Sequence, residues 1–458
     1  MRITNDLKSF SAKGLALLMV LLASPALKAQ EVKQTLTLKD AINYALENKA
    51  EAKKAKLAVE NSEYQIQEVR ARALPTISAD GNVTYNPILQ QNAIDVGAFS
   101  GGAPNIQLVA LGQKWSSVGG VNLTQNIFDQ SVFTGLKAAK TTREFYQINA
   151  TLTDEQVIER VANSYYNVYV ERVQLTVVDS NYVNTVKIRD IIKGQYENGL
   201  SKRIDLDRIT VTLSNIDAER QQLKSNLKQQ ENALKFYIGM PINTPIVLPD
   251  TEFEVTPLAL SEAPDTSKRS EYLLLDKQKE LLQYNKKAVI AEYYPTLSLT
   301  AGYNYIGQGP ELPWFKKPSD NVYWSDYSSI ALNLHVPIFN GFGTRSRVRQ
   351  ADIELRETEV DLEDTKLSLD LAFENAKSQI EVSLSNINNQ RDNVRLAQEV
   401  LDDTENNYHN GLATLTDLLD AETAYITSQR NYTNALLGYK LAEVQLIKAK
   451  GELKTLTN

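Results

Sequence analysis

The sequence has no cysteine and only two histidines among its 458 residues. Without cysteine there are no disulfides, thiolate metal sites, cysteine nucleophiles or lipid anchor on an N-terminal cysteine. His335 and His409 stand apart, and neither belongs to a metal-ligand spacing. The sequence also lacks a nucleophile motif and a phosphate-binding glycine loop. We therefore expect no cofactor, no metal and no enzymatic activity.

Long apolar runs and an excess of positive charge are also missing. Beyond the N-terminus no run of 18 apolar residues occurs, so no helix is expected to span a membrane. The formal net charge of −7 argues against nucleic acid as a partner, because that partner requires a basic face. Residues 1–29 place Arg2, Lys8 and Lys13 ahead of the apolar stretch LALLMVLLASPAL, which predicts a secretory signal peptide. This segment carries net +3, so the mature chain is near −10.

Proline is absent between Pro104 and Pro241 and again after Pro337. Proline-free tracts with few glycines permit very long helices. We expect such helices over about 130–195 and 342–407, each roughly 100 Å long at about 1.5 Å per residue. Lengths of this order are typical of coiled coils and helical tubes.

Four short segments alternate between apolar and polar residues instead. They are predicted as strands over about 76–86, 115–126, 296–306 and 328–337. The alternation suits a strand that crosses a bilayer at a tilt, and equally a half-buried sheet of a soluble domain. All three tryptophans lie at or between these strands, which favours the membrane, since aromatic residues gather at bilayer interfaces. The intervening residues 86–114 and 306–328 are expected to be long polar loops.

The chain also repeats itself. YENGL begins at Tyr196 and YHNGL at Tyr408, 212 positions later, while LPTIS (74–78) returns as YPTLS (294–298). Each half therefore reads helix, strand, loop, strand, long helix, turn, long helix. The predicted organisation is a signal peptide (1–29), a first repeat (30–240), a proline-rich connector in an equatorial region (241–266) and a second repeat (267–458).

Four strands are too few to close a transmembrane barrel, which needs about eight, and an open edge is unstable in lipid. If the strands lie in a membrane, several chains must share one barrel, and three would supply twelve strands.

In the order of its motifs the chain resembles the TolC family of outer-membrane efflux proteins. The resemblance rests on LTLKDAINYALENKAEAKKAK (36–56), Pro75, Pro295, PIFNGF (337–342) and the two Tyr-x-x-Gly turns. It covers about residues 35–455. The first half departs from the pattern at Asn126, where the second half has Pro337.

The resemblance implies a mainly α fold with a small β part. Long antiparallel helical hairpins would form a periplasmic α-barrel, and four strands per chain would join a trimeric twelve-stranded β-barrel. The implied protein is a homotrimer in the outer membrane of a Gram-negative bacterium, in contact with outer-membrane lipid. It would be the passive exit duct of a tripartite efflux or type I secretion system. It would be closed at its periplasmic end and opened by a periplasmic adaptor (membrane fusion) protein and an inner-membrane RND or ABC transporter.

Two other classes compete with this interpretation. A periplasmic coiled-coil scaffold or adaptor protein with a soluble β-domain would also contain long exported helical hairpins. It predicts extraction without detergent, and the strand alternation and tryptophan positions argue against it. An exported hydrolase with a helical insert lacks a catalytic constellation.

The two repeated turns, about 196–201 and 408–414, are predicted to be the tips of helical hairpins. Asn-Gly suits left-handed backbone at a helix end, and Thr414 with Asp417 fits a capping box that starts the next helix. In the family these tips meet the adaptor. The resemblance thus makes four residues candidates for adaptor contact: Gly199, Leu200, Gly411 and Leu412.

Asp417 and Asp420 are three residues apart and share a helix face. A solvated helix N-terminus explains such a pair, because the helix dipole favours acids there. The resemblance implies instead that three copies of each ring the tunnel constriction, where they attract cations and repel anions.

The resemblance further implies a latch between neighbouring helix pairs, with Asp205 and Tyr408 as partners. Ala413 stands where the family has its basic latch residue, and Arg203 or Lys202 is the candidate replacement.

Overall fold

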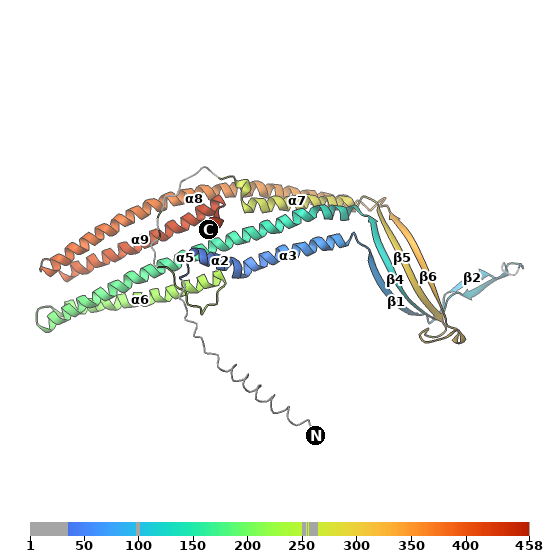
Figure 1. The fold of residues 1–458 in the computed structure, drawn as a ribbon, viewed down its shortest axis with the longest axis horizontal. Coiled ribbons are helices and arrows are strands. Elements are labelled where there is room, and N and C mark those ends of the chain that lie inside the picture. The colour runs from blue at the N-terminus through green and yellow to red at the C-terminus, as the bar shows by residue number, and fades with distance from the viewer. Residues whose placement is uncertain (1–34, 98–100, 250–252, 254, 256–263, 458) are drawn as a thin grey trace, which may run out of the picture.

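The computed structural model describes residues 35–97, 101–249, 253, 255 and 264–457. The predicted signal peptide and part of the predicted connector lie outside these residues. The chain is mainly helical, with 67% helix and 15% strand. A long, gently curved layer of helices carries a small sheet at one end (Figure 1).

The two predicted long helices are present. α5 (Gln130–Glu197) and α8 (Gly343–His409) contain 68 and 67 residues, roughly 100 Å each at about 1.5 Å per residue. Neither contains proline, so each hydrogen-bond ladder runs unbroken. The other α-helices are α2 (Leu38–Asn48), α3 (Ala50–Ala71), α6 (Arg203–Ile238), α7 (Ser270–Ala291) and α9 (Leu415–Lys450). Short 3-10 turns are η1 (Thr266–Lys268), η2 (Pro318–Asp320) and η3 (Leu453–Thr457).

Within the described ranges, no helix combines the length and the apolar character needed to cross a membrane.

The helices lie side by side in one layer. Near the sheet the order of neighbours is α3–α5–α7–α8, and toward the far tips it is α6–α5–α9–α8. α5 and α8 thus run the whole length, while α8 forms one edge of the layer and α3 and α6 form the other (Figure 1). The largest core cluster lies where α2, α5, α6, α8 and α9 meet, and includes Tyr165, Ile238, Tyr439 and Leu446.

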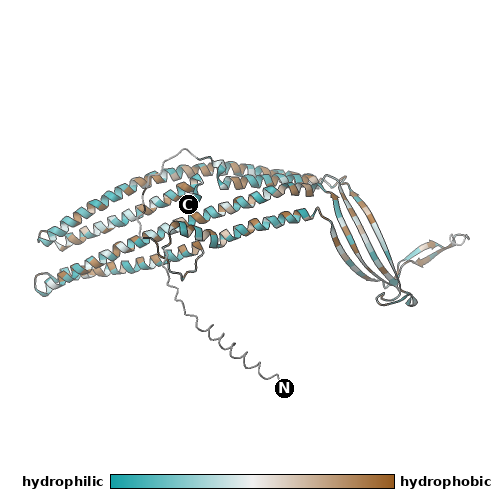
Figure 2. Cartoon of the chain, viewed as in Figure 1, coloured by the Kyte–Doolittle hydropathy of each residue, from teal (hydrophilic) through white to brown (hydrophobic). Residues whose placement is uncertain are grey.

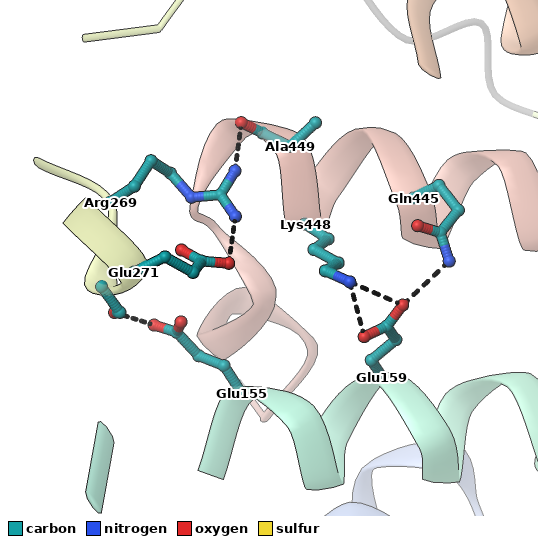
Figure 3. A network of polar contacts seen from close by, with 8 residues as sticks. Glu155, Glu159, Arg269, Glu271, Gln445, Lys448 and Ala449 are labelled. Atoms are coloured by element: carbon teal, nitrogen blue, oxygen red, sulfur yellow. Dashed lines mark hydrogen bonds and ion pairs between the residues drawn. The ribbon is translucent and has the colours of Figure 1, made fainter. Parts of the chain in front are cut away.

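Polar contacts join the two halves beside this core (Figure 3). The Glu159 carboxylate of α5 accepts hydrogen bonds from Lys448 Nζ and from Gln445 Nε2 of α9. Within the second half, Arg269, only 5% exposed, donates through Nη1 to the Ala449 carbonyl and through Nη2 to Glu271. A cation near the end of α9 also complements the helix dipole.

The main sheet is antiparallel, in the order β1-β4-β5-β6. Its strands are β1 (Thr76–Tyr85), β4 (Trp115–Phe128), β5 (Thr296–Gly309) and β6 (Tyr323–His335).

The outer part of this sheet is longer than the alternation predicts, because β5 reaches Gly309 and β6 starts at Tyr323. Here glycine replaces the apolar residues: the Trp324 ring lies against Gly307, and Val322 lies against Gly309. The pairing of β5 with β6 therefore continues beyond the residues in which apolar and polar side chains alternate.

The prediction of a long loop over 86–114 is wrong in part. β2 (Gln91–Asp95) pairs with β3 (Ile106–Ala110) in an antiparallel hairpin that projects beyond the main sheet (Figure 1). Two strands of five residues each are too short for a clear alternation signal.

Candidate functional site

The two hairpin tips repeat one turn in detail. The C-cap residue of α5 is Asn198 and that of α8 is Asn410, and in each case the asparagine side chain donates to the carbonyl four residues earlier. Gly199 and Gly411 follow with φ of 76° and 74°, a backbone conformation that favours glycine. The residue after each glycine is a largely exposed leucine, Leu200 at 80% and Leu412 at 79%. Both leucines are therefore accessible to a partner at the tips.

The second tip is capped as predicted. Thr414 Oγ1 accepts from the Asp417 N–H at 3.2 Å, and the Asp417 carboxylate accepts from the Thr414 N–H at 2.8 Å. The Thr414 hydroxyl, followed by its backbone N–H, holds the pKa of the Asp417 carboxyl below its usual value. Asp417 is therefore ionised at neutral pH and at the same time serves as a helix cap.

Asp420 lies one turn further along α9 and is exposed. Its carboxylate accepts no hydrogen bond from the described part of the chain. The pair thus consists of one carboxylate held by the cap and one that is open to solvent.

The two predicted latch residues lie on neighbouring hairpins, Asp205 on α6 and Tyr408 on α8. Tyr408 packs against the small apolar cluster of Ile192, Ile209, Leu415 and Leu419. Burial, together with the negative charge of Asp205, raises the pKa of the Tyr408 phenol. No hydrogen bond joins the Asp205 and Tyr408 side chains within the described part of the chain, and the latch stays a prediction.

Within the described residues of one chain, the side chains of the two candidate basic replacements do not pair with Asp205 or Tyr408. Arg203 pairs with Asp207 at 3.6 Å on its own helix, and Lys202 is the uncapped N-cap residue of α6. A contact that sequence reasoning missed joins the hairpins instead: Arg208 of α6 donates to Thr416 Oγ1 of α9. The available signal was the repeat itself, since Arg208 occupies the position that Asp420 has in the second half.

A cavity of about 550 Å³ separates the hairpins just behind the tips. α5, α8 and α9 line it with Lys187, Glu405, Tyr408, His409 and Glu422, among other residues. Burial raises the pKa of Glu422 to about 7, the negative charge of Glu405 adds to the rise, and a hydrogen bond from Thr185 opposes it. The sequence pattern gave no reason to single out Glu422.

The main sheet has one mainly apolar and one mainly polar face, and apolar and polar residues alternate along much of its strands (Figure 2). Aromatic residues gather at the outer end of the apolar face. There Tyr85 and Trp115 have ring centroids 4.5 Å apart, and Tyr305 stacks on Trp324 at 5.0 Å. The apolar face also carries Ile77, Val83, Val121, Leu123, Leu299, Ile330, Leu332 and Leu334, and the polar face carries Ser78, Asp80, Asn122, Asn304 and Ser329.

Both long edges of the molecule are apolar and uncovered. One face of α8 carries a stripe of exposed side chains at helical spacing: Ile353, Val360, Leu367, Leu371, Val382, Leu396 and Val400. The opposite edge carries exposed side chains of α3 and α6: Leu57, Tyr64, Ile204, Val211 and Phe236. The edge strands of the main sheet continue these two helical edges, because β1 follows α3 and β6 precedes α8 in the chain.

Comparisons with known proteins agree with this architecture. The chain matches the family described as "Outer membrane efflux protein" over residues 41–240 and 276–452. The outer membrane protein TolC of Vibrio cholerae is 24% identical over 346 residues, which cover 73% of this chain and 76% of that protein.

Solved structures are similar in fold. The CmeC outer membrane channel of Campylobacter jejuni has a TM-score of 0.73 at 17% identity, over 91% of this chain and 85% of that one. The open state of the MtrE outer membrane channel of Neisseria gonorrhoeae has a TM-score of 0.70 at 21% identity, over 92% and 90%.

Proposed function

The chain belongs to the outer membrane efflux protein family, and from this membership we propose that three copies form a passive exit duct for efflux or secretion. Proteins of this family lie in the outer membrane with a large periplasmic part, which speaks against a purely periplasmic scaffold. Relatives are channels rather than enzymes, and we propose no enzymatic activity for this chain.

The observation that carries the proposal is the pair of apolar edges. They differ from one another, so α8 of one copy would pack against α3 and α6 of the next, a head-to-tail contact that generates rings. The same rotation would pair β6 with β1 of the next copy. Three copies would give a closed barrel of twelve strands, which removes every sheet edge.

In this ring the apolar sheet face meets lipid and the polar face lines the lumen. The helical layers continue the lumen into the periplasm as an α-barrel. The tips would narrow it at the far end, where Asp417 and Asp420 of three copies would form an acidic, cation-selective constriction. We propose that the mouth is closed at rest, held by Asp205 with Tyr408 and by Arg208 with Thr416.

Opening would come from partners. A periplasmic adaptor would dock on the exposed tip residues, Gly199, Leu200, Gly411 and Leu412, and an inner-membrane RND or ABC transporter would supply energy. An adaptor shifts the equilibrium only by binding the open mouth more tightly than the closed one. The two solvated leucines are suited to such a contact.

Two measurements on the detergent-purified protein test the proposal. Native mass spectrometry should give three copies, and a planar bilayer should record a small, cation-selective, mostly closed pore. A monomer that stays soluble without detergent and forms no pore would contradict the proposed duct.

A further inference from the structure

The loop between β5 and β6 folds back over the apolar face of the sheet. Trp324 Nε1 donates to the Pro313 carbonyl at 3.3 Å, and Trp314 Nε1 donates to Ser117 Oγ at 3.0 Å. Pro313 and Ser117 are buried. Ser117, Gly307 and Trp324 form one row across β4, β5 and β6. The two indoles therefore fasten the loop to β4 and to β6 at the outer end of the sheet.

The fastened loop presents two aromatic rings outward. Trp314 remains 51% exposed and Phe315 is fully exposed at 101%. Phe315 also has φ of 62°, an outlier for a bulky residue that the surrounding structure must enforce. The enforcing contacts are close by: Lys316 N–H donates to the Pro313 carbonyl, and Lys316 Nζ pairs with Glu311 at 2.7 Å. The backbone of Phe315 therefore adopts an unfavourable conformation while its phenyl ring stays exposed to solvent.

We propose that Trp314 and Phe315 form a lipid anchor that lies in the interfacial region of the outer leaflet. The proposal rests on the proposed function, which places the apolar sheet face in lipid. The anchor continues the aromatic cluster of Tyr85, Trp115, Tyr305 and Trp324 on the same face.

Three features identify lipid as the occupant. Aromatic rings prefer the boundary between headgroups and acyl chains. The Trp314 N–H is already bonded within the protein, so its ring needs no further polar partner. Lys316 and Lys317 follow directly and are exposed, which suits the headgroup region. A second copy of this chain is a poorer fit, since Trp314 is bonded to Ser117 of the inner strand β4, while copies would meet at β1 and β6.

The lack of cysteine makes a direct test simple. Single cysteines are introduced by Phe315→Cys, Ile330→Cys and Ser329→Cys in the full chain and labelled with a nitroxide. Each protein is reconstituted into phosphatidylcholine vesicles, and electron paramagnetic resonance measures collision with oxygen, which concentrates in lipid, and with a nickel chelate, which stays in water. Ile330 and Ser329 are adjacent residues on the apolar and polar faces of β6, so they provide matched references. No tryptophan is altered.

The anchor predicts that the oxygen-to-nickel collision ratio at position 315 is at least severalfold higher than at 329 and lower than at 330. A water-like ratio at 315 with a lipid-like ratio at 330 would overturn the anchor and leave the proposed duct intact. Low collision rates with both reagents at 315 would indicate a protein contact and would also overturn it. Water-like ratios at both 329 and 330 would instead reject the lipid-facing sheet, and with it the proposed function.

Discussion

Both hairpin tips end a long helix with Asn-Gly and expose a leucine, yet the residues that follow differ in capping and charge. The second tip continues with the Thr414–Asp417 capping box and then Asp420. In the first tip, Lys202 takes the position of Thr414, and its side chain does not cap α6. Arg208 takes the position of Asp420. The shared Asn-Gly-Leu sequence forms the same turn at both tips. The residues after it differ: those of α9 form the acidic surface, and Arg208 of α6 forms the contact between the hairpins. Four predictions test this division, from the largest expected effect to the smallest.

The first prediction removes the acids of the second tip. Asp417→Ala with Asp420→Ala should lower the cation-over-anion permeability ratio severalfold, because six carboxylates would leave the trimeric constriction. Reversal potentials in planar bilayers under a salt gradient measure this ratio. Asp207→Ala removes an exposed acid of the first tip and should leave the ratio unchanged. Unchanged selectivity in the double variant would remove Asp417 and Asp420 from the pore.

The second prediction breaks the contact between hairpins. Arg208→Ala removes the hydrogen bond to Thr416 and should raise the open probability of single channels several-fold. Arg203 offers a matched control, because its ion pair stays within α6; Arg203→Ala should leave gating as it is. If both variants gate like the unchanged protein, the Arg208 contact does not hold the mouth closed.

The third prediction concerns the cavity behind the tips. The pKa of Glu422, about 7, lies above its ordinary value of 4.5, so the folded packing favours the neutral acid. The contribution of neutral Glu422 to the stability of the folded tip is fully present below about pH 4.5 and is lost as the pH rises through about 7. The facing groups are Lys187 and Thr185 of α5 and Glu405, Tyr408 and His409 of α8.

Hydrogen exchange at the start of α9 measures this loss. Protection factors should fall by roughly tenfold between pH 5 and pH 8, and Glu422→Gln should abolish the dependence. Glu405→Gln is the matched control. It should shift the dependence to lower pH, since it removes the negative charge that adds to the rise. A dependence that persists in Glu422→Gln would assign it to another group.

The fourth prediction gives the first tip the cap of the second. Lys202→Thr places threonine three residues before Asp205, which recreates the capping box and should stabilise the start of α6 by about 1 kcal/mol. The converse change, Thr414→Ala, should cost about as much in α9. Thermal unfolding of both variants checks the signs. The negative charge of Asp205 raises the pKa of Tyr408, so moving the Asp205 carboxylate into a capping box should lower that pKa, which ultraviolet titration measures. An unchanged pKa would mean that the Asp205 carboxylate has not moved.

Local rules made the helices and turns predictable. Proline-free tracts allowed α5 and α8, and Asn-Gly specified Gly199 and Gly411 with positive φ. Thr414 three residues before Asp417 specified the cap.

The remaining features depend on partners distant in sequence. The extension of β6 requires Gly307 of another strand to accommodate Trp324. The bond from Arg208 to Thr416 spans 208 positions. Glu422 is partly buried where α5 and α8 pack against α9, so no pattern within α9 reveals it.

The uninterrupted course of α5 and α8 has a mechanical consequence. Each is a stiff rod that joins the sheet to a tip, and over about 100 Å a tilt of about 5° displaces the far end by roughly 9 Å. Long helices bend gently at little local cost, so the distortion is spread over many turns and no hinge residue is needed. In the proposed duct, a partner that binds the tip would therefore displace the tip far more than the sheet.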